Sequence, residues 1–294
     1  MWCDWENPAL TSSPYNPCKP YLRFDDNLWN DLLAAMKKGG FNMVVIDLGD
    51  GVKYASHPEI AVEHAWSTSR LKDELKKLRD MGLEPIPKLN FSTCHDQWLG
   101  PYARMVSTPK YYEVCRDLIA EVIDLFEKPR LFHLGMDEEE QKHQRNFEHV
   151  VIRQHNLWWN DLRKFYEQVE AAGVRAWIWS DYVWEHPELF WERMPTSILQ
   201  SNWYYGEKFS TDILAVRTYK ELEDHKYDQV PTLSNWTTPA NIQGTFDFCR
   251  KNIPAERLKG FILAPWRPTL PETRQRHMEA IEHMAQEIAK IKAG

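Results

Sequence analysis

Short apolar runs alternate with longer amphipathic stretches along the chain. Eight of the runs have the β-branched and aromatic composition that is typical of buried strands. They cover residues 1–6, 42–48, 84–91, 130–136, 174–180, 197–204, 230–236 and 260–266. Strand and helix in regular alternation form a parallel sheet with crossover helices, so the pattern predicts an α/β fold.

The stretches between these runs carry apolar residues at the three- and four-residue spacing of amphipathic helices. The clearest predicted helices cover residues 27–40, 67–82, 111–126, 157–173 and 274–291. Several end in glycine, at Gly39-Gly40, Gly82 and Gly173, which suits the left-handed cap that leads into the next strand. Eight such rounds predict one (β/α)8 TIM barrel over residues 1–294. An open doubly wound sheet is the alternative, but no Gly-rich phosphate loop follows the first strand. That strand starts at residue 1, which suggests that a further segment precedes it.

Composition narrows the function classes. A net charge of -7 and a pI near 5.9 argue against a nucleic-acid partner, because such proteins concentrate Lys and Arg on one face. No apolar run of about 18 residues is present, so the sequence predicts a soluble protein without a membrane span, in a compartment that stays open. The cysteines Cys3, Cys18, Cys94, Cys115 and Cys249 are odd in number and have no CxxC spacing, so we expect thiols, with neither a metal nor another cofactor.

The end of the fourth predicted strand carries the candidate chemistry, because barrel active sites lie on the loops after the strands. Side chains alternate along a strand, so His133 and Asp137 are expected to point into the barrel mouth, with Glu138 just beyond. Adjacent carboxylates repel, and one pKa should therefore rise, giving an acid beside a carboxylate. For Glu139 and Glu140 we expect a solvated helix N-terminus instead.

The other predicted strand ends supply aromatic and hydrogen-bonding side chains. A sugar has an apolar face and a hydroxyl edge, so this mixture suits a carbohydrate substrate. Trp5 and Trp177 are expected in the core, and Trp158-Trp159 either packs on the barrel or marks a dimer face, leaving monomer or homodimer open. The candidate binding residues are Asp4, Asp47, Asp50, Lys88, Asn90, His95, His133, Trp179, Asp181, Gln200, Asn202, Trp203, Tyr204, Ser234, Trp236, Trp266 and Arg267.

The segment His133-Leu134-Gly135-Met136-Asp137-Glu138 resembles the H-x-G-x-D-E signature of family 20 β-N-acetylhexosaminidases. Pro87-Lys88-Leu89-Asn90 followed by His95 is similar to the P-E-x-D…H loop of that family. Trp179-x-Asp181, Gln200-x-x-Trp203, Trp236 and Trp266 resemble its later strand ends.

The resemblance implies a retaining glycoside hydrolase in which the 2-acetamido group of the substrate is the nucleophile. Glu138 would then be the general acid and base, and Asp137 would orient the acetamido group. The seventh predicted strand end, Leu233-Ser234-Asn235-Trp236, carries no carboxylate that could serve as a protein nucleophile.

The chain also departs from the family pattern. The family's first-strand Arg has no counterpart in residues 1–6, its second loop is replaced by residues 47–51, its closing W-x-E reads Trp266-Arg267-Pro268, and its N-terminal domain is absent.

These departures keep three alternatives open. The first is a glycosidase on a non-acetamido sugar that pairs Glu138 with Asp181 or Asp47, and the second is a carbohydrate-binding barrel without turnover. A metal-dependent hydrolase using His133, Asp137, His95 or Asp47 ranks last, because no HxH or HExxH spacing is present.

Overall fold

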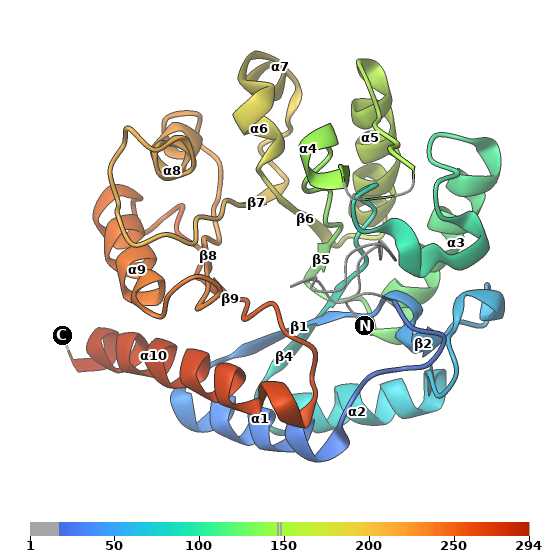
Figure 1. Ribbon diagram of the computed structural model, residues 1–294, viewed down its shortest axis with the longest axis horizontal. Coiled ribbons are helices and arrows are strands. Elements are labelled where there is room, and N and C mark those ends of the chain that lie inside the picture. Colours follow the sequence, from blue (N-terminus) through green and yellow to red (C-terminus); the bar gives the residue numbers. More distant parts are fainter. Residues whose placement is uncertain (1–17, 146, 148, 294) are drawn as a thin grey trace. The chain divides into compact units, whose positions relative to one another are not determined.

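The computed structural model describes residues 18–145, 147 and 149–293. They form two compact units: residues 18–23, 43–80 and 84–178 belong to the first, and residues 24–42, 81–83 and 179–293 to the second (Figure 1). The predicted strand at 1–6, with Cys3, Asp4 and Trp5, lies outside the described residues.

The strands are β1 (Met43–Asp47), β2 (Val52–Lys53), β3 (Trp66–Ser67), β4 (Glu84–Lys88), β5 (Leu131–His133), β6 (Arg175–Trp179), β7 (Leu199–Ser201), β8 (Thr232–Leu233) and β9 (Ile262–Leu263). The helices are α1 (Asp26–Gly39), α2 (Thr68–Asp80), α3 (Pro109–Leu125), α4 (Gln141–Gln144), α5 (Asn156–Ala171), α6 (Tyr182–Glu185), α7 (Pro187–Arg193), α8 (Leu214–Asp224), α9 (Ala240–Asn252) and α10 (Arg274–Ala293). Short 3₁₀ turns cover η1 (Gly49–Gly51), η2 (Pro58–Ile60), η3 (Asp96–Tyr102) and η4 (Pro271–Thr273).

The first unit contains a parallel sheet in which β4 lies between β1 and β5, and β6 follows β5. Its helices carry buried side chains at helical spacing, such as Leu71, Leu75 and Leu78 on α2. Trp158 and Trp159 on α5 are both buried in this chain, as packing against the fold requires. Parallel order brings the carboxyl ends of β1, β4 and β5 to one edge, where the candidate residues of this unit lie.

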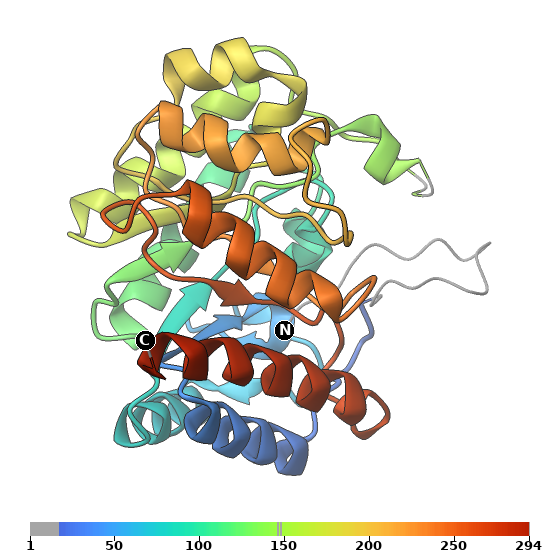
Figure 2. The ribbon, with the colours of Figure 1, turned by 90° about the vertical axis from the view of Figure 1, so that its left-hand side faces the viewer.

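The second unit repeats the alternation of strands and helices. β8 pairs with β9 in parallel, and a bridge between Gln200 and Gln229 joins β7 to the segment before β8. Helices α1 and α10, from opposite ends of the chain, pack side by side through Leu28, Leu32 and Ile281 (Figure 2). The apolar faces that the sequence predicts for these two helices therefore meet one another.

The predicted α/β alternation is confirmed, and the predicted caps have the expected conformation. Gly40, Gly82 and Gly173 have φ values of 85°, 76° and 73°, in the left-handed region. Two features were not predicted: the two-residue strands β2 and β3, and a disulfide at Cys18, which corrects the expectation that every cysteine is a thiol. No helix within the described residues is long and apolar enough to cross a membrane.

Candidate active site

The turn after β5 shapes the site. The strand ends at His133, earlier than predicted, because Gly135, Met136 and Glu138 take positive φ values of 73°, 74° and 58°. The alternation expected through Asp137 is therefore wrong, since left-handed residues cannot continue a strand. The side-chain oxygen of Asn90 accepts the backbone N–H of Met136 at 3.2 Å and stabilises the turn.

Asp137 is buried and its two carboxylate oxygens have different partners. Asn90 Nδ2 donates to Oδ1 at 2.8 Å, and His95 Nε2 lies 3.4 Å from Oδ2. Burial acts to raise the pKa of Asp137, but the charge and hydrogen bond of His95, the charge of Lys88 and the Asn90 hydrogen bond outweigh it and hold the pKa well below 3.8. Asp137 is therefore held as an anion, and the pKa rise predicted for one carboxyl group does not occur at Asp137.

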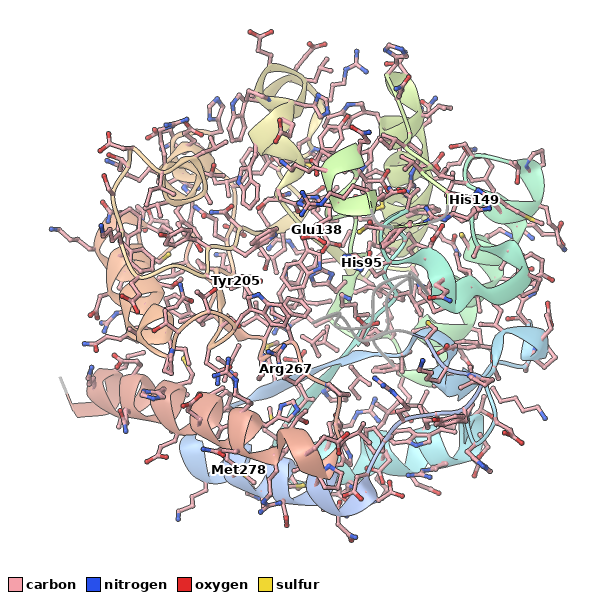
Figure 3. The ribbon with its side chains drawn as sticks, in the orientation of Figure 1. His95, Glu138, His149, Tyr205, Arg267 and Met278 are labelled. Carbon is pink, nitrogen blue, oxygen red and sulfur yellow. The ribbon has the colours of Figure 1, made fainter. Side chains whose placement is uncertain are left out.

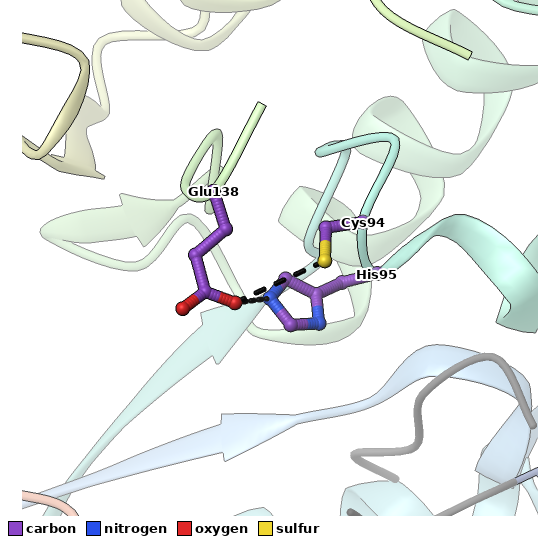
Figure 4. Close-up of side chains that lie close together, drawn as sticks. All are labelled: Cys94, His95 and Glu138. Carbon is purple, nitrogen blue, oxygen red and sulfur yellow. Dashed lines mark hydrogen bonds and ion pairs between the residues drawn. The ribbon is translucent and has the colours of Figure 1, made fainter. Parts of the chain in front are cut away.

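Glu138 lies beside the same histidine and is more open to solvent, with about a quarter of its side chain exposed (26%). His95 Nε2 is 3.3 Å from Glu138 Oε2 (Figures 3 and 4). His143 Nε2 is 3.9 Å from Oε1 of the same carboxylate. The thiol of Cys94 lies 3.9 Å from Oε2. A carboxyl group that is both reachable from solvent and contacted by an imidazole can exchange a proton with a bound molecule.

His133 and Lys88 are buried and interact electrostatically with Asp137. His133 is fully buried, accepts the Gly135 N–H on Nδ1 at 3.0 Å and packs on Trp177, which is in the core as expected. Burial, with the charge of Lys88, holds the His133 pKa well below 6.5, so its ring is neutral. The Lys88 ammonium donates to Asp47. His133 thus stabilises the turn through its hydrogen bond with Gly135.

Asp50 lies in η1, after β1, and is buried. Burial raises its pKa, and its carbonyl accepts the N–H of Val62 at 3.1 Å. Its backbone therefore anchors the loop that follows β1.

Glu139 is not the solvated helix start that the acidic run predicts. It is buried, and its Oε1 accepts the backbone N–H of Thr93 at 2.7 Å and a guanidinium N–H of Arg153 at 2.6 Å. Arg153 also contacts Asp161 on α5 at 3.1 Å, and all three side chains are buried. Glu140 precedes α4 without capping it and contacts His143 Nδ1 at 2.9 Å. The prediction of a solvated acid is wrong for Glu139 because its carboxylate forms a buried ion pair with Arg153, fourteen residues later in the sequence.

The second unit contains an aromatic cluster made largely of predicted residues. Trp203 and Tyr205 stack with ring centroids 5.2 Å apart, and Trp184 packs edge-on against Trp203 at 4.6 Å. Trp179 and Trp266 lie 5.7 Å apart, and Trp266 Nε1 donates to the Tyr205 hydroxyl at 2.9 Å. Aromatic faces with a polar edge of this kind suit a sugar ring.

The remaining predicted residues of this unit make hydrogen bonds mainly to backbone carbonyls of the same unit. Asn202 accepts from Trp184 Nε1 and donates to the Ala215 carbonyl, Gln200 donates to the Ile198 carbonyl, and Ser234 donates to the Ala264 carbonyl. Tyr204 packs edge-on against Phe209, buried Asp181 immediately precedes α6, and the Arg267 guanidinium lies 4.2 Å from the Trp236 ring centroid. Tyr204, Trp236 and Arg267 are the partly open members of this group.

Four of these residues were not among the sequence candidates: Cys94 and His143 in the first unit, and Trp184 and Tyr205 in the second. Cys94 precedes His95 and Tyr205 follows Tyr204, so adjacency to a candidate was the available signal. His143 lies on the short helix α4, three residues after Glu140. That helical spacing from the acidic run was the signal available in the sequence.

Comparison with solved structures identifies the fold. The chitobiase of Flavobacterium johnsoniae matches with a TM-score of 0.63 and 15% identity over 89% of this chain and 46% of its own. Dispersin B matches with 0.57 and 14% identity over 90% and 95% of the two chains. The Streptomyces plicatus N-acetyl-β-hexosaminidase matches with 0.64 and 12% identity over 91% and 62%.

The chain has the α/β barrel fold of family 20 hexosaminidases. It spans about half the length of the chitobiase (46%) and nearly all of dispersin B (95%). No protein-family model and no curated protein sequence matches it. The hexosaminidase fold therefore agrees with the resemblance that the segment from His133 to Glu138 carries.

Proposed function

We propose that this protein is a retaining glycoside hydrolase that acts on 2-acetamido sugars by substrate assistance. Glu138 is the general acid and base, and Asp137 orients the acetamido group. The observation that carries the proposal is the contact of one imidazole nitrogen with both carboxylates. His95 Nε2 lies 3.4 Å from Asp137 Oδ2 and 3.3 Å from Glu138 Oε2.

The two carboxylates have environments that suit different roles. Asp137 is buried and its lowered pKa keeps it anionic, so it can accept the acetamido N–H but cannot supply a proton. Glu138 is partly exposed and can meet the glycosidic oxygen of a bound substrate. Environments that separate two neighbouring carboxyl groups in this way assign the acid and the anion.

In the first step, Glu138 donates its proton to the glycosidic oxygen while the acetamido carbonyl oxygen attacks the anomeric carbon. The bond to the leaving alcohol breaks, and a cyclic oxazolinium forms whose N–H donates to Asp137. In the second step, Glu138 takes a proton from water as the water oxygen attacks the same carbon and reopens the ring. The two inversions give net retention.

The decisive experiment compares aryl β-glycosides with and without the 2-acetamido group, using wild type, Glu138→Gln and Asp137→Asn. Hydrolysis confined to acetamido sugars, with kcat falling about 10² to 10⁴-fold in Glu138→Gln, is expected, since general acid catalysis supplies that factor. The loss should shrink for aryl groups that leave as weakly basic phenolates, because these need less protonation. Glu113→Gln, which changes an exposed side chain on α3, is the matched control and should retain activity.

Each other outcome points to a different function. Hydrolysis of plain glycosides favours the alternative in which Glu138 acts with Asp181 or Asp47. Binding of acetamido sugars in calorimetry without product release would favour a binding protein.

A further inference from the structure

Cys94, His95 and Glu138 bring three different metal-binding groups together (Figure 4). Each offers one donor atom, and the thiol sulfur, the imidazole nitrogen and the carboxylate oxygen all lie within 4.8 Å of one another. The carboxylate oxygen Glu138 Oε2 is 3.3 Å from His95 Nε2 and 3.9 Å from Cys94 Sγ. The sulfur and the nitrogen come from adjacent residues on the loop after β4.

These separations fit a tetrahedral ion. Zinc bonds of about 2.0 Å to nitrogen and oxygen and about 2.3 Å to sulfur place neighbouring ligand atoms about 3.3 to 3.5 Å apart. The nitrogen and oxygen already have this spacing, the sulfur lies 3.9 Å from that oxygen, and the sulfur and nitrogen, which lie within 4.8 Å of one another, would draw together around the ion.

The loop is also held in place before any ion arrives. Ser92 Oγ accepts the backbone N–H of Cys94 at 3.0 Å, and the Ser92 carbonyl accepts the N–H of His95 at 3.0 Å. The Ser92 hydroxyl in turn donates to the carbonyl of Asp137, the residue before Glu138. The two loops that carry the three donors are thereby fastened together, which lowers the ordering cost of binding.

We propose that Cys94, His95 and Glu138 bind one divalent cation of the zinc class, with the fourth position open to water. A thiolate and an imidazole select Zn²⁺ or Cd²⁺ over Mg²⁺ and Ca²⁺, which prefer oxygen ligands. Binding would occupy the oxygen of Glu138 and so inhibit hydrolysis. This inhibition rests on the proposed function of Glu138, whereas binding itself does not.

The test measures binding directly on the full chain after treatment with a chelator. Titration with zinc chloride in a calorimeter should give one site in the wild type, and Cys94→Ala should weaken it at least about tenfold through loss of the thiolate. Cys115→Ala is the matched control, because Cys115 is a fully buried thiol on α3 and should leave zinc affinity unchanged. Cadmium chloride should produce the near-ultraviolet thiolate-to-metal absorption in the wild type and in Cys115→Ala, and none in Cys94→Ala.

The wild-type spectrum decides the matter even if Cys94→Ala does not fold. Cys18 is in a disulfide, and Cys115 and Cys249 are fully buried, which raises their pKa values well above 9.0, so among the described cysteines Cys94 is the one that can supply the thiolate. A cadmium spectrum without a thiolate band, or zinc affinity equal in wild type and Cys94→Ala, overturns the site. Zinc that binds at Cys94 without slowing an active enzyme overturns the inhibition alone. A protein without hydrolase activity that still binds zinc through Cys94 refutes only the proposed function.

Discussion

The side-chain oxygen of Asn90 lies 1.9 Å from the position that a Cβ atom at Gly135 would occupy. Gly135 also has a φ of 73°, so two separate constraints require glycine there. The same Asn90 side chain donates to Asp137 and accepts from Met136. Any movement of Asn90 would therefore disturb the carboxylate that the proposed mechanism uses.

We predict that Gly135→Ala lowers the free energy of unfolding by clearly more than backbone strain alone would lower it. The same substitution should reduce activity. Gly82→Ala is the matched control, because Gly82 has a φ of 76° but its Cβ would meet nothing within 4 Å. Strain alone should cost about 1 to 2 kcal/mol in Gly82→Ala. Urea unfolding of both variants measures the difference, and equal losses would show that the contact with Asn90 is easily relieved.

The lowered pKa of Asp137 predicts how stability depends on pH. A carboxyl whose folded pKa lies below its unfolded value of 3.8 stabilises the fold fully above that pH, and the contribution is lost as pH falls below it. The unfolding free energy of wild type should therefore fall more steeply below about pH 4 than that of Asp137→Asn, by up to about 1.4 kcal/mol per pH unit.

Urea unfolding between pH 3 and pH 7 checks this prediction. Asp80→Asn, which removes a solvent-exposed carboxylate on α2, should follow the wild-type curve. Parallel curves for wild type and Asp137→Asn would mean that folding does not favour the ionised form of Asp137.

Local sequence patterns predicted the fold well because the spacing of apolar residues reflects which side chains are buried. The predicted apolar runs correspond to β1, β4 and β6. The predicted amphipathic stretches correspond to α1, α2, α3, α5 and α10, with small shifts in their ends. The residues that follow each strand could be placed at the same sheet edge by parallel order alone. This is why Asn90, His95, Asp137 and Glu138 could be grouped before the structure was known.

The errors arose where distant contacts override local preference. β5 stops at His133 because Asn90, from the preceding strand loop, holds the next residues in a turn. Glu139 looks like a solvated acid in sequence, and only the packing of Arg153 makes it a buried ion-pair partner. The disulfide at Cys18 has no spacing signal, since cysteine pairing depends on three-dimensional proximity.

Arg153 provides a further prediction about the loop that carries Glu138. Its guanidinium contacts Glu139 at 2.6 Å and Asp161 at 3.1 Å, and all three side chains are buried. Arg153→Met would leave two buried carboxylates without their cation, so we expect a loss of about 3 to 5 kcal/mol. Arg130→Met, which breaks an exposed pair with Glu84, should cost about 0 to 1 kcal/mol. Similar unfolding midpoints for the two variants would contradict this role for Arg153.

The aromatic cluster of the second unit supplies the last prediction. Trp266 donates to the Tyr205 hydroxyl and packs against Trp179, so its ring holds the polar edge of the cluster in place. If these rings bind the sugar equally well before and during reaction, Trp266→Ala should raise KM with little change in kcat. Loss of one aromatic contact of about 1.4 kcal/mol corresponds to about a tenfold rise.

Trp191→Ala is the control for this test, because Trp191 stacks on His225 at 4.0 Å and belongs to no predicted binding group. Steady-state kinetics on an acetamido aryl glycoside should leave its KM near the wild-type value. If Trp266→Ala instead lowers kcat while KM stays constant, the cluster stabilises the transition state more than the bound substrate.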